Sequence, residues 1–357
     1  MQQEIDFYET ANRDHPDFAA LLPVYIGTIS LNDATDVNSL NEQLPGVADH
    51  LSQGLKEEAV LRAKEAAAEA AAEQADLAWK PNKNRKIPTN RSVVLQNSTH
   101  GFKKPNVLDA KLGSRLWADD APEAKRLRFD AITKSTTNGT HGFRIAGMRI
   151  YKGSDQPDDL DADGFMAYNK DYGRFRVNQD NLVQEIRKFI FNARAGIDAD
   201  LGRAVAQAFL EDLRNVEHVL SHAETRMYSA SLLFTFEGDG EALRAAIEEN
   251  NAIADHAKLE TEVLISGIGL PKGKAAEIDV QAISGVIEGD VKVMELMGDV
   301  AADGEEEDDE ELSNLPRIYS LKLIDFAHAE WVPGQGPDEN SLLGVRSLIK
   351  IFEELAE

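Results

Sequence analysis

Pro105-Asn106-Val107-Leu108-Asp109-Ala110-Lys111-Leu112-Gly113 sets an acid and a lysine two residues apart, after a short apolar run and before a glycine. Residues i and i+2 of an extended strand point to the same side, so Asp109 and Lys111 are predicted to face one cleft together. A second apolar segment far downstream ends on another acid, Asp325. Two acids and a lysine at one cleft favour phosphoryl transfer, because that chemistry depends on positioning and charge neutralisation.

The bulk composition limits the classes of protein that this chain can belong to. Its 357 residues allow one large or two medium lobes with ample core. A net charge of −25 argues against nucleic acid or anionic membranes as direct partners, since both need a basic surface. The absence of cysteine excludes disulfides, zinc-thiolate sites and cysteine nucleophiles. We find no apolar run of membrane-spanning length and no signal peptide, and therefore expect an intracellular protein without membrane insertion.

Hydrophobic periodicity predicts a mixture of helices and strands. A helix and a strand are expected in the first thirty residues, and the Asp120-x-x-Glu123 capping-box pattern predicts a helix start. The other predicted strands are 92–95, 142–151, 229–236 and 319–326, and the other predicted helices are 198–224 and 341–355. Two stretches interrupt this pattern, at about 33–90 and about 241–316. The first contains a helix-forming segment, 57–78, and the second ends in an acidic run, 303–311.

A group of cations stands out in this acidic chain. Lys125, Arg126 and Arg128 occupy the helix predicted after Asp120, and Lys170 lies in a later loop. Such a cluster is either a solvated helix face or a local pocket for a small, highly anionic ligand. The glycine- and lysine-rich stretch 267–274 fits neither the Walker spacing nor the dinucleotide fingerprint. Asp325 before Phe326 matches the metal-binding aspartate of kinases, although an acid at a strand end also commonly caps a turn.

Taken together, these motifs resemble the inositol polyphosphate kinase family. Its signature P-x-x-x-D-x-K-x-G is met by Pro105, Asp109, Lys111 and Gly113. The other matching motifs are Ile324 to His328, Ala230 to Leu233 with Glu237-Gly238, Gly142 to Ile145 with Gly147-Met148, and Tyr172-Gly173-Arg174. The compact length and the acidic insertion are most similar to the fungal inositol polyphosphate multikinase branch of that family.

The resemblance implies an α+β, two-lobed kinase-like fold, with antiparallel sheets in both lobes and a helical inositol-phosphate-binding segment. An N-lobe would span 1–97, with its insertion at about 33–90. A C-lobe would span 98–357, with inositol-phosphate-binding helices at about 119–196 and the variable acidic insertion at about 241–316. ATP would bind between the lobes.

The resemblance also implies roles for individual residues. Asp109 would hold the nucleotide ribose, Asp325 would bind Mg²⁺ between the phosphates, and Lys111 would neutralise the travelling phosphoryl group between donor and acceptor. Two further groups of binding residues are implied by their positions relative to the family motifs. The adenine hinge would be Gln96, Asn97 and Ser98. The inositol-phosphate contacts would be Lys111, Lys125, Arg126, Arg128, Lys170 and His328. The implied reaction is ATP- and Mg²⁺-dependent phosphorylation of soluble inositol trisphosphate and tetrakisphosphate, in the nucleus and cytoplasm.

Some features depart from the family pattern and leave alternatives open. The chain begins inside the E-x-x-F-Y helix, before which relatives carry a lysine strand that grips ATP phosphates; either the gene model starts too late or the kinase is incomplete. Gln96 replaces an acidic hinge residue and Ala230 a serine. One alternative is an inositol hexakisphosphate kinase; another is a catalytically impaired scaffold whose acidic run 303–311 binds basic nuclear partners. The order of hydroxyls, lipid inositide activity and oligomeric state stay open.

Overall fold

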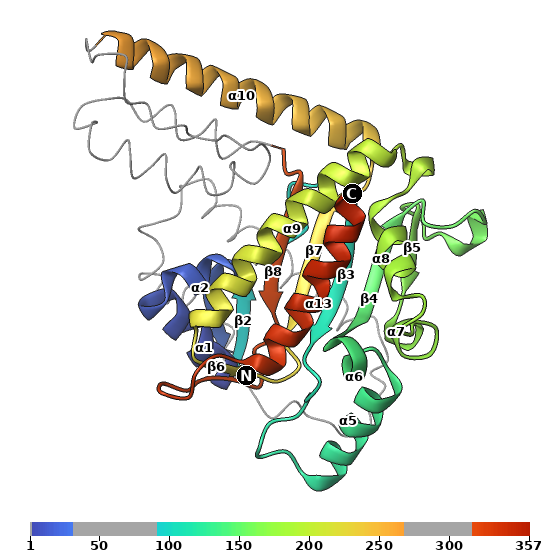
Figure 1. Ribbon diagram of the computed structural model, residues 1–357, viewed down its shortest axis with the longest axis vertical. Helices are drawn as coiled ribbons and strands as arrows, with labels where there is room; N and C mark the ends of the chain where they lie inside the picture. The colour runs from blue at the N-terminus through green and yellow to red at the C-terminus, as the bar shows by residue number, and fades with distance from the viewer. Residues whose placement is uncertain (1, 31–90, 268–315) are drawn as a thin grey trace, which may run out of the picture.

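The computed structural model describes residues 2–30, 91–267 and 316–357 (Figure 1). Three features of the sequence therefore lie outside the described residues. They are the helix predicted at 57–78, residues 268–274 of the glycine- and lysine-rich stretch, and the acidic run 303–311.

A five-stranded antiparallel sheet forms the centre of the molecule. Its strand order is β5-β4-β3-β7-β8. The strands are β3 (Pro105–Leu112), β4 (Phe143–Tyr151), β5 (Phe165–Tyr168), β7 (Ser231–Glu237) and β8 (Tyr319–Ile324). Along β3 every second residue is buried, so that Leu108, Ala110 and Leu112 face one side while Asp109 and Lys111 face the other. The sheet therefore has an apolar face and a polar face.

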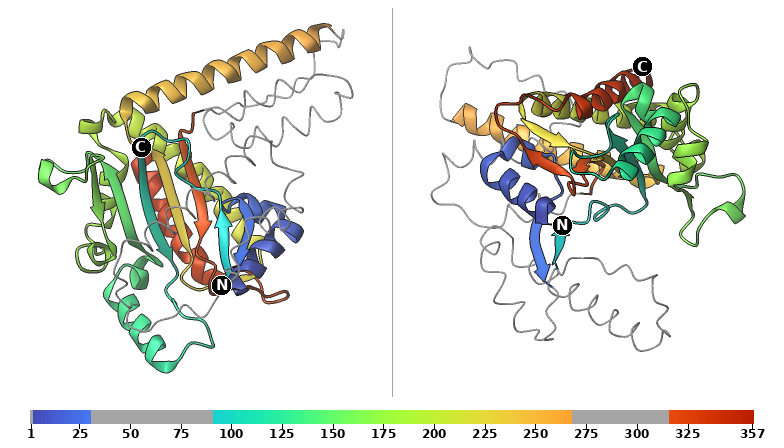
Figure 2. Two further views of the ribbon diagram at one scale, coloured as in Figure 1. Left: turned by 180° about the vertical axis from the view of Figure 1, so that it is seen from behind. Right: turned by 90° about the horizontal axis from the view of Figure 1, so that it is seen from below.

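Two long helices cover the apolar face of the sheet. They are α9 (Ala199–His222) and α13 (Glu339–Ala356), which lie side by side on that face, as both the front and back views show (Figures 1 and 2). Phe209 of α9 packs edge-on against Phe234 of β7, with ring centroids 5.1 Å apart, and Phe352 of α13 stacks on Phe234 at 5.4 Å. Because the apolar side chains fill this side, the polar chemistry is confined to the opposite face.

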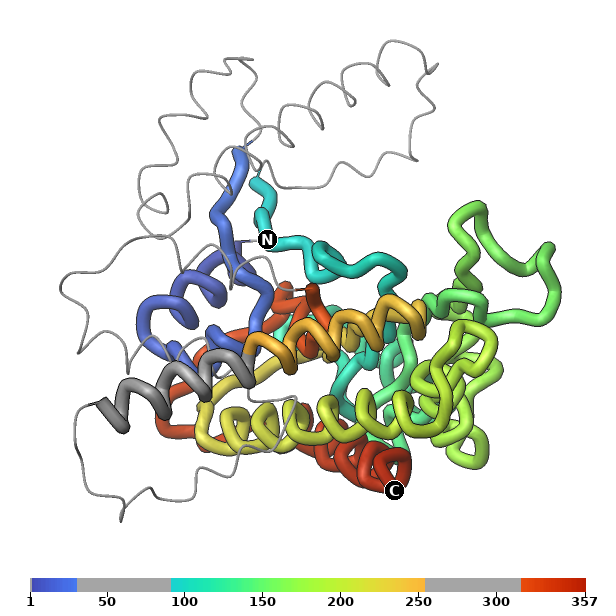
Figure 3. The backbone as a smooth tube through the Cα atoms, turned by 90° about the horizontal axis from the view of Figure 1, so that it is seen from above, coloured from blue at the N-terminus to red at the C-terminus, as the bar shows by residue number. Residues whose placement is uncertain are grey.

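A smaller unit stands beside the central sheet. It consists of α1 (Gln2–Asp14), α2 (Pro16–Ala20) and the antiparallel pair β1 (Tyr25–Ser30) and β2 (Arg91–Leu95), and the tube view from above shows this strand pair projecting from the main body (Figure 3). Residues 96–104 connect its sheet to β3 of the larger one. The mixture of helices with antiparallel sheets in two units confirms the predicted α+β class and is consistent with a kinase-like fold.

The remaining described elements surround the ends of the central sheet. They are α5 (Glu123–Ser135), α6 (Asn138–His141), α7 (Lys170–Phe175), α8 (Leu182–Ile190), α10 (Gly240–Gly267), the short 3₁₀ turns at Pro157–Asp159 and Ala193–Ala195, and the pair β6 (Thr225–Met227) and β9 (Ala329–Trp331). The segment 119–196 thus contains two strands of the sheet besides its helices. No described helix is both long and apolar enough to cross a membrane.

The capping box predicted at Asp120 is wrong. Helix α5 begins at Glu123, and its N-cap is Pro122, which has no side chain able to cap. Asp120 lies two residues before the observed N-cap because the chain first makes a turn, in which Ala121 N–H donates to Ala118 O at 3.0 Å. The predicted helix near this position is nevertheless present.

Candidate active site

The polar face of the central sheet brings the two sequence motifs together. Lys111 Nζ donates to Asp325 Oδ2 at 3.0 Å and to the Ser229 carbonyl oxygen at 2.6 Å. The Lys111 side chain is 16% exposed, whereas that of Asp325 is 57% exposed. An ammonium group has three donors, so one N–H of Lys111 is left for a ligand. The prediction that Asp109 and Lys111 share one face of a strand is confirmed.

Asp325 has an unusual backbone conformation. Its φ is +71°, in the left-handed region that a non-glycine residue adopts only at a cost. The next residue holds it in place, because Phe7 of α1 stacks on Phe326 with ring centroids 4.7 Å apart and Tyr8 meets that ring edge-on at 5.2 Å. Burial raises the pKa of Glu4, which also lies on α1. Helix α1 thus supports the carboxylate at the end of β8.

Asp109 lies deeper in the same face than Asp325. Burial raises the pKa of its carboxyl group, and the charge of Lys111 opposes that rise. Its Oδ1 atom is buried and has no hydrogen-bond partner within the described part of the chain. A buried acceptor without a partner is costly, so this oxygen is suited to receive a donor from a bound ligand.

Two arginines complete the polar face, and the sequence had marked them only as parts of family landmarks. Arg144 of β4 is the direct cross-strand neighbour of Lys111 and is 4% exposed. Its Nε and Nη1 atoms, and the Nε of Arg174 on α7, lack hydrogen-bond partners among the described residues. Burial, followed by the charge of Arg174, lowers the pKa of Arg144. The sequence feature that could have identified Arg144 as a site residue is its positive charge between the apolar residues Phe143 and Ile145 of a predicted strand.

Gly173 explains how α7 brings Arg174 to this place. A Cβ atom on Gly173 would lie 1.8 Å from the carbonyl oxygen of Ile145. Only a glycine therefore lets α7 rest directly on β4. The Tyr-Gly-Arg landmark thus has a structural glycine followed by an arginine that faces the site.

Lys125 of helix α5 lies at the site, whereas Arg126 of the same helix contacts the loop that precedes it. Lys125 Nζ lies 3.2 Å from Nε2 of His328, and the pKa of His328 is lowered first by burial and then by the Lys125 charge. Arg126 Nε donates to Ala121 O at 2.6 Å, and its Nη2 bonds Asp119 O. Arg128 and Lys170 are exposed and make no side-chain hydrogen bond or ion pair with the residues that are described.

The predicted hinge residues lie in the connection between the two sheets. Gln96 N–H donates to Val24 O at 2.9 Å, which ties the connection to the smaller unit. Asn97 Oδ1 accepts from the backbone N–H and the hydroxyl of Thr99, at 3.0 and 2.8 Å, and thereby closes a turn around Ser98. The segment is thus an ordered link beside the polar face.

Other motif residues shape the backbone around the site. Gly113, with φ of +92°, is pressed against Asn340 of α13, whose Oδ1 accepts the Ser114 and Arg115 N–H groups. Buried Glu237 accepts from the N–H groups of residues 103 and 104, just before β3. The glycine of the first signature and the Glu-Gly after β7 therefore hold the two ends of β3 in place.

The donor set sets limits on the metal that the site could hold. The described residues include no group of three or more His, Cys, Asp or Glu side chains arranged as metal ligands. Asp325 instead offers a single, largely exposed carboxylate beside Lys111. Mg²⁺ is commonly held by one or two carboxylates, with phosphates and water filling the remaining positions. The site therefore fits a divalent ion that arrives with phosphates.

Comparison with known proteins agrees with this geometry. The family profile described as "IPK: Inositol polyphosphate kinase" matches residues 92–353. The chain is 31% identical over 269 residues to the inositol polyphosphate multikinase of Saccharomyces cerevisiae, covering 73% of this chain and 67% of that protein. It is 32% identical over 149 residues to the multikinase of Schizosaccharomyces pombe, covering 42% of this chain and 51% of that one.

Two further similarities are more distant. Human inositol hexakisphosphate kinase 1 is 25% identical over 285 residues, which cover 77% of this chain and 54% of that protein. The match thus spans about half of the human and Schizosaccharomyces pombe proteins. The crystal structure of inositol phosphate multikinase Ipk2 from S. cerevisiae, in complex with ADP and Mn²⁺, superposes with a TM-score of 0.55 at 24% identity, covering 100% of this chain and 97% of that one. This likeness shows a common fold.

Proposed function

The chain belongs to the inositol polyphosphate kinase family, and we propose that it transfers the terminal phosphoryl group of ATP to a hydroxyl of a soluble inositol polyphosphate. The observation that carries this proposal is the 3.0 Å ion pair between Lys111 and Asp325, residues 214 positions apart. It joins the P-x-x-x-D-x-K-x-G motif to the I-D-F-A-H motif on one polar face. The site thereby combines a cation with a carboxylate suited to a phosphate-bound metal ion.

Lys111 has the central part in the proposed reaction. Asp325 Oδ2 and Ser229 O occupy two of its three donors and fix the direction of the ammonium group. The third donor is free for the phosphoryl group, whose oxygens carry the charge of the transition state. Preorganised donors of this kind lower the barrier because they need no reorganisation when charge develops.

The neighbouring residues divide between nucleotide and acceptor. The unpartnered Oδ1 of Asp109 is suited to accept from a ribose hydroxyl, and in the proposal the backbone of Gln96 to Ser98 reads the adenine. Asp325 would hold Mg²⁺, which supplies charge neutralisation between the nucleotide phosphates when bound.

On the acceptor side, cations are available from three elements. Arg144 of β4 and Arg174 of α7 have donors without partners among the described residues, and Lys125 of α5 lies 3.2 Å from His328, three residues after Asp325. Several cations around one small site favour a compact polyanion, because arginine binds phosphate oxygens in pairs. Arg128 and Lys170 are exposed, so in the proposal they reach the outer phosphates of a bound acceptor.

Within the family, we propose the multikinase activity on inositol trisphosphate and tetrakisphosphate. It is supported by the 31% identity to the S. cerevisiae multikinase, against 25% to the human hexakisphosphate kinase. A nuclear and cytoplasmic location is proposed from the family likeness, and imaging of a fluorescent fusion in the host cell tests it.

The proposal is tested with purified protein, ATP and MgCl₂, in parallel reactions with inositol trisphosphate and inositol hexakisphosphate. Chromatography of the products is expected to show tetrakis- and pentakisphosphates from the first acceptor and little product from the second. Pyrophosphate products from hexakisphosphate alone would instead assign the hexakisphosphate kinase activity. Phosphorylation of neither acceptor contradicts the proposal.

A further inference from the structure

Helix α5 carries the cation that meets His328, yet it is not anchored by a hydrophobic core. None of its residues is buried, and Leu127 is one of the most exposed large apolar side chains among those described. Most helices are held by an apolar stripe, so the position of α5 must depend on other contacts. Three polar contacts hold it besides Lys125: the Thr133 hydroxyl donates to Ser114 O at 2.8 Å, and Asp130 and Arg126 contact the loop before the helix.

Trp117 lies at the centre of this loop, between two guanidinium groups. Arg115 Cζ is 4.0 Å and Arg126 Cζ is 4.9 Å from the centroid of its ring. The indole Nε1–H donates to Asp130 Oδ1 at 2.7 Å. Since Arg126 and Asp130 belong to α5 while Arg115 and Trp117 precede it, the stack fastens the helix to the loop that follows β3. We call Arg115, Trp117, Arg126 and Asp130 the tryptophan clamp.

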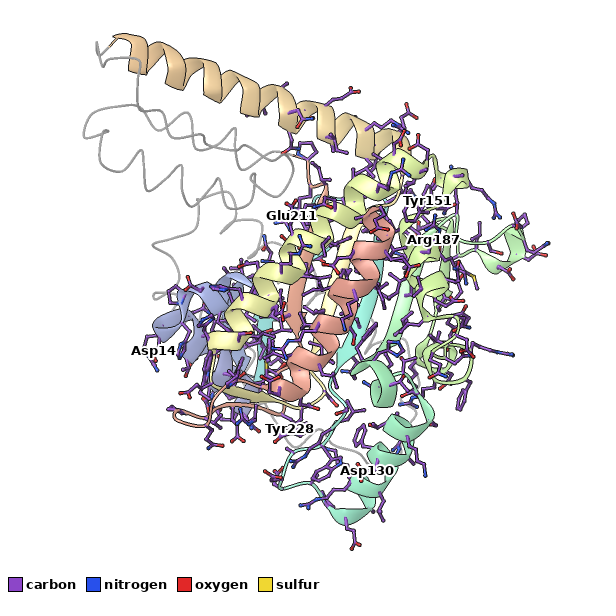
Figure 4. All side chains as sticks on the ribbon, viewed as in Figure 1. Asp14, Asp130, Tyr151, Arg187, Glu211 and Tyr228 are labelled. Atoms are coloured by element: carbon purple, nitrogen blue, oxygen red, sulfur yellow. The ribbon has the colours of Figure 1, made fainter. Side chains whose placement is uncertain are left out.

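The clamp also reaches the residues that hold the catalytic lysine. Arg115 Cζ lies 4.9 Å from the ring centroid of Tyr228, and Tyr228 N–H donates to His328 O at 3.1 Å. The next residue, Ser229, accepts from Lys111 Nζ through its carbonyl and donates its hydroxyl to Leu116 O at 3.0 Å. Asp130 on α5 and Tyr228 lie at the same end of the molecule (Figure 4).

We propose that Arg115, Trp117 and Arg126 are positioning residues that hold α5, and with it Lys125, over the phosphoryl-transfer site. This inference rests on the proposed function, and it assigns Arg126 a different part from that of a direct phosphate contact. The Nε and Nη2 atoms of Arg126 donate to the carbonyl groups of Ala121 and Asp119, and its Cζ atom lies 4.9 Å from the centroid of the Trp117 ring. A guanidinium engaged in this way orients the helix rather than the substrate.

The predicted consequence is a selective loss of acceptor binding. Near-attack geometry is sensitive to displacements of about 1 Å, and the helix that the clamp holds carries Lys125 on the acceptor side. Trp117→Leu, which removes the aromatic face, is expected to raise KM for inositol trisphosphate at least about tenfold while KM for ATP stays within about twofold. Trp117→Phe keeps the face for both guanidinium groups but loses the indole N–H, so it is expected to raise KM for inositol trisphosphate severalfold, less than Trp117→Leu does.

The indole hydrogen bond has its own matched pair of variants. Asp130→Asn keeps the Oδ1 acceptor and is expected to behave as the unchanged protein. Asp130→Leu removes the acceptor and is expected to raise KM for inositol trisphosphate severalfold. Equal KM values for these two variants contradict the part given to Asp130.

A double-mutant cycle separates positioning from direct contact. If Trp117 and Arg126 act through one clamp, Trp117→Leu combined with Arg126→Met loses no more than about twofold beyond the worse single variant in kcat/KM. If Arg126 binds a phosphate directly, the two losses multiply, and that result overturns the proposal.

Hydrogen–deuterium exchange provides a readout independent of turnover. Trp117→Leu is expected to speed exchange in residues 123–135 while the strands of the central sheet stay protected, and Trp117→Phe is expected to do so much less. Unchanged exchange in α5 refutes the clamp even if the protein is an active kinase. A protein inactive on every inositol phosphate, but with faster exchange in α5, contradicts the proposed function and leaves the clamp standing.

Discussion

Replacement of Gly173 by alanine tests whether close packing of α7 on β4 builds the cationic side of the site. The added Cβ would lie 1.8 Å from the Ile145 carbonyl oxygen and 2.9 Å from its carbonyl carbon. Both are backbone atoms, so no side chain can turn away to relieve the clash. Helix α7 must move from the strand by more than about 1 Å, a distance large for a close-packed interior.

The size of the effect follows from this geometry. Overpacking a well-packed contact costs about 1–3 kcal/mol, occasionally more, and a clash with backbone belongs at the upper end. At about 2–4 °C per kcal/mol for a domain of this order of size, the midpoint of thermal unfolding is expected to fall by about 6–12 °C. Because Arg174 moves with the helix, KM for inositol trisphosphate is expected to rise as well.

Gly147 lies on β4, the strand that α7 packs against, and offers a matched control. A Cβ on Gly147 would find its nearest neighbour, Tyr168 O, at 3.8 Å, an ordinary van der Waals distance. Gly147→Ala should therefore leave the unfolding midpoint within about 2 °C of the parent or raise it slightly, because it restricts the unfolded chain. Circular dichroism during heating measures both variants. If Gly173→Ala unfolds at the same temperature as Gly147→Ala, the packing argument is refuted.

Three further predictions concern neighbouring residues. Arg144→Met is expected to leave the unfolding midpoint unchanged or raised, since it removes a buried charge with unpartnered donors, and to raise KM for the inositol phosphate at least about tenfold; a lowered midpoint with unchanged KM contradicts this. Asn138→Ala takes away the donor to the carbonyls of Lys111 and Gly113, at 3.1 and 2.7 Å, and should cost about 2–4 kcal/mol in urea unfolding; a loss below about 1 kcal/mol would show that water replaces the amide. The pKa of His328 lies below its ordinary 6.5 because of partial burial and Lys125, so the unfolded chain gains a proton first and the free energy of unfolding should fall as pH drops below 6.5; in His328→Gln this fall should be smaller, and an identical pH profile would argue against the lowered pKa.

The local patterns predicted much of the fold correctly. Alternation along residues 105–112 predicted which side chains of β3 face the site, and the apolar stripe from Leu201 to Leu220 predicted α9. These succeed because one face of each element packs on the core, and the period of the pattern reports that face directly.

The features that were missed depend on contacts between distant segments. Arg144 is buried where β4 pairs with β3 and α7 packs closely on β4, neither of which a single segment shows. Arg126 was expected to contact phosphate because its neighbours are basic, but a single segment could not show that its Nε and Nη2 atoms bond the preceding loop or that its guanidinium lies beside Trp117. The roles of Asp109, Lys111 and Asp325 were implied by family motifs, and the structure adds the polar face that brings them together.

The most direct measurement of the central claim compares the parent protein with Asp325→Asn in a radiolabelled phosphate-transfer assay from ATP to inositol trisphosphate. The substitution keeps the shape of the side chain and removes the charge that faces both Lys111 and the expected metal ion. We expect clear formation of inositol tetrakisphosphate by the parent and a loss of kcat of at least about a hundredfold in the variant, with the unfolding midpoint nearly unchanged because the carboxylate is largely exposed. Full activity of Asp325→Asn would show that this carboxylate takes no part in phosphoryl transfer.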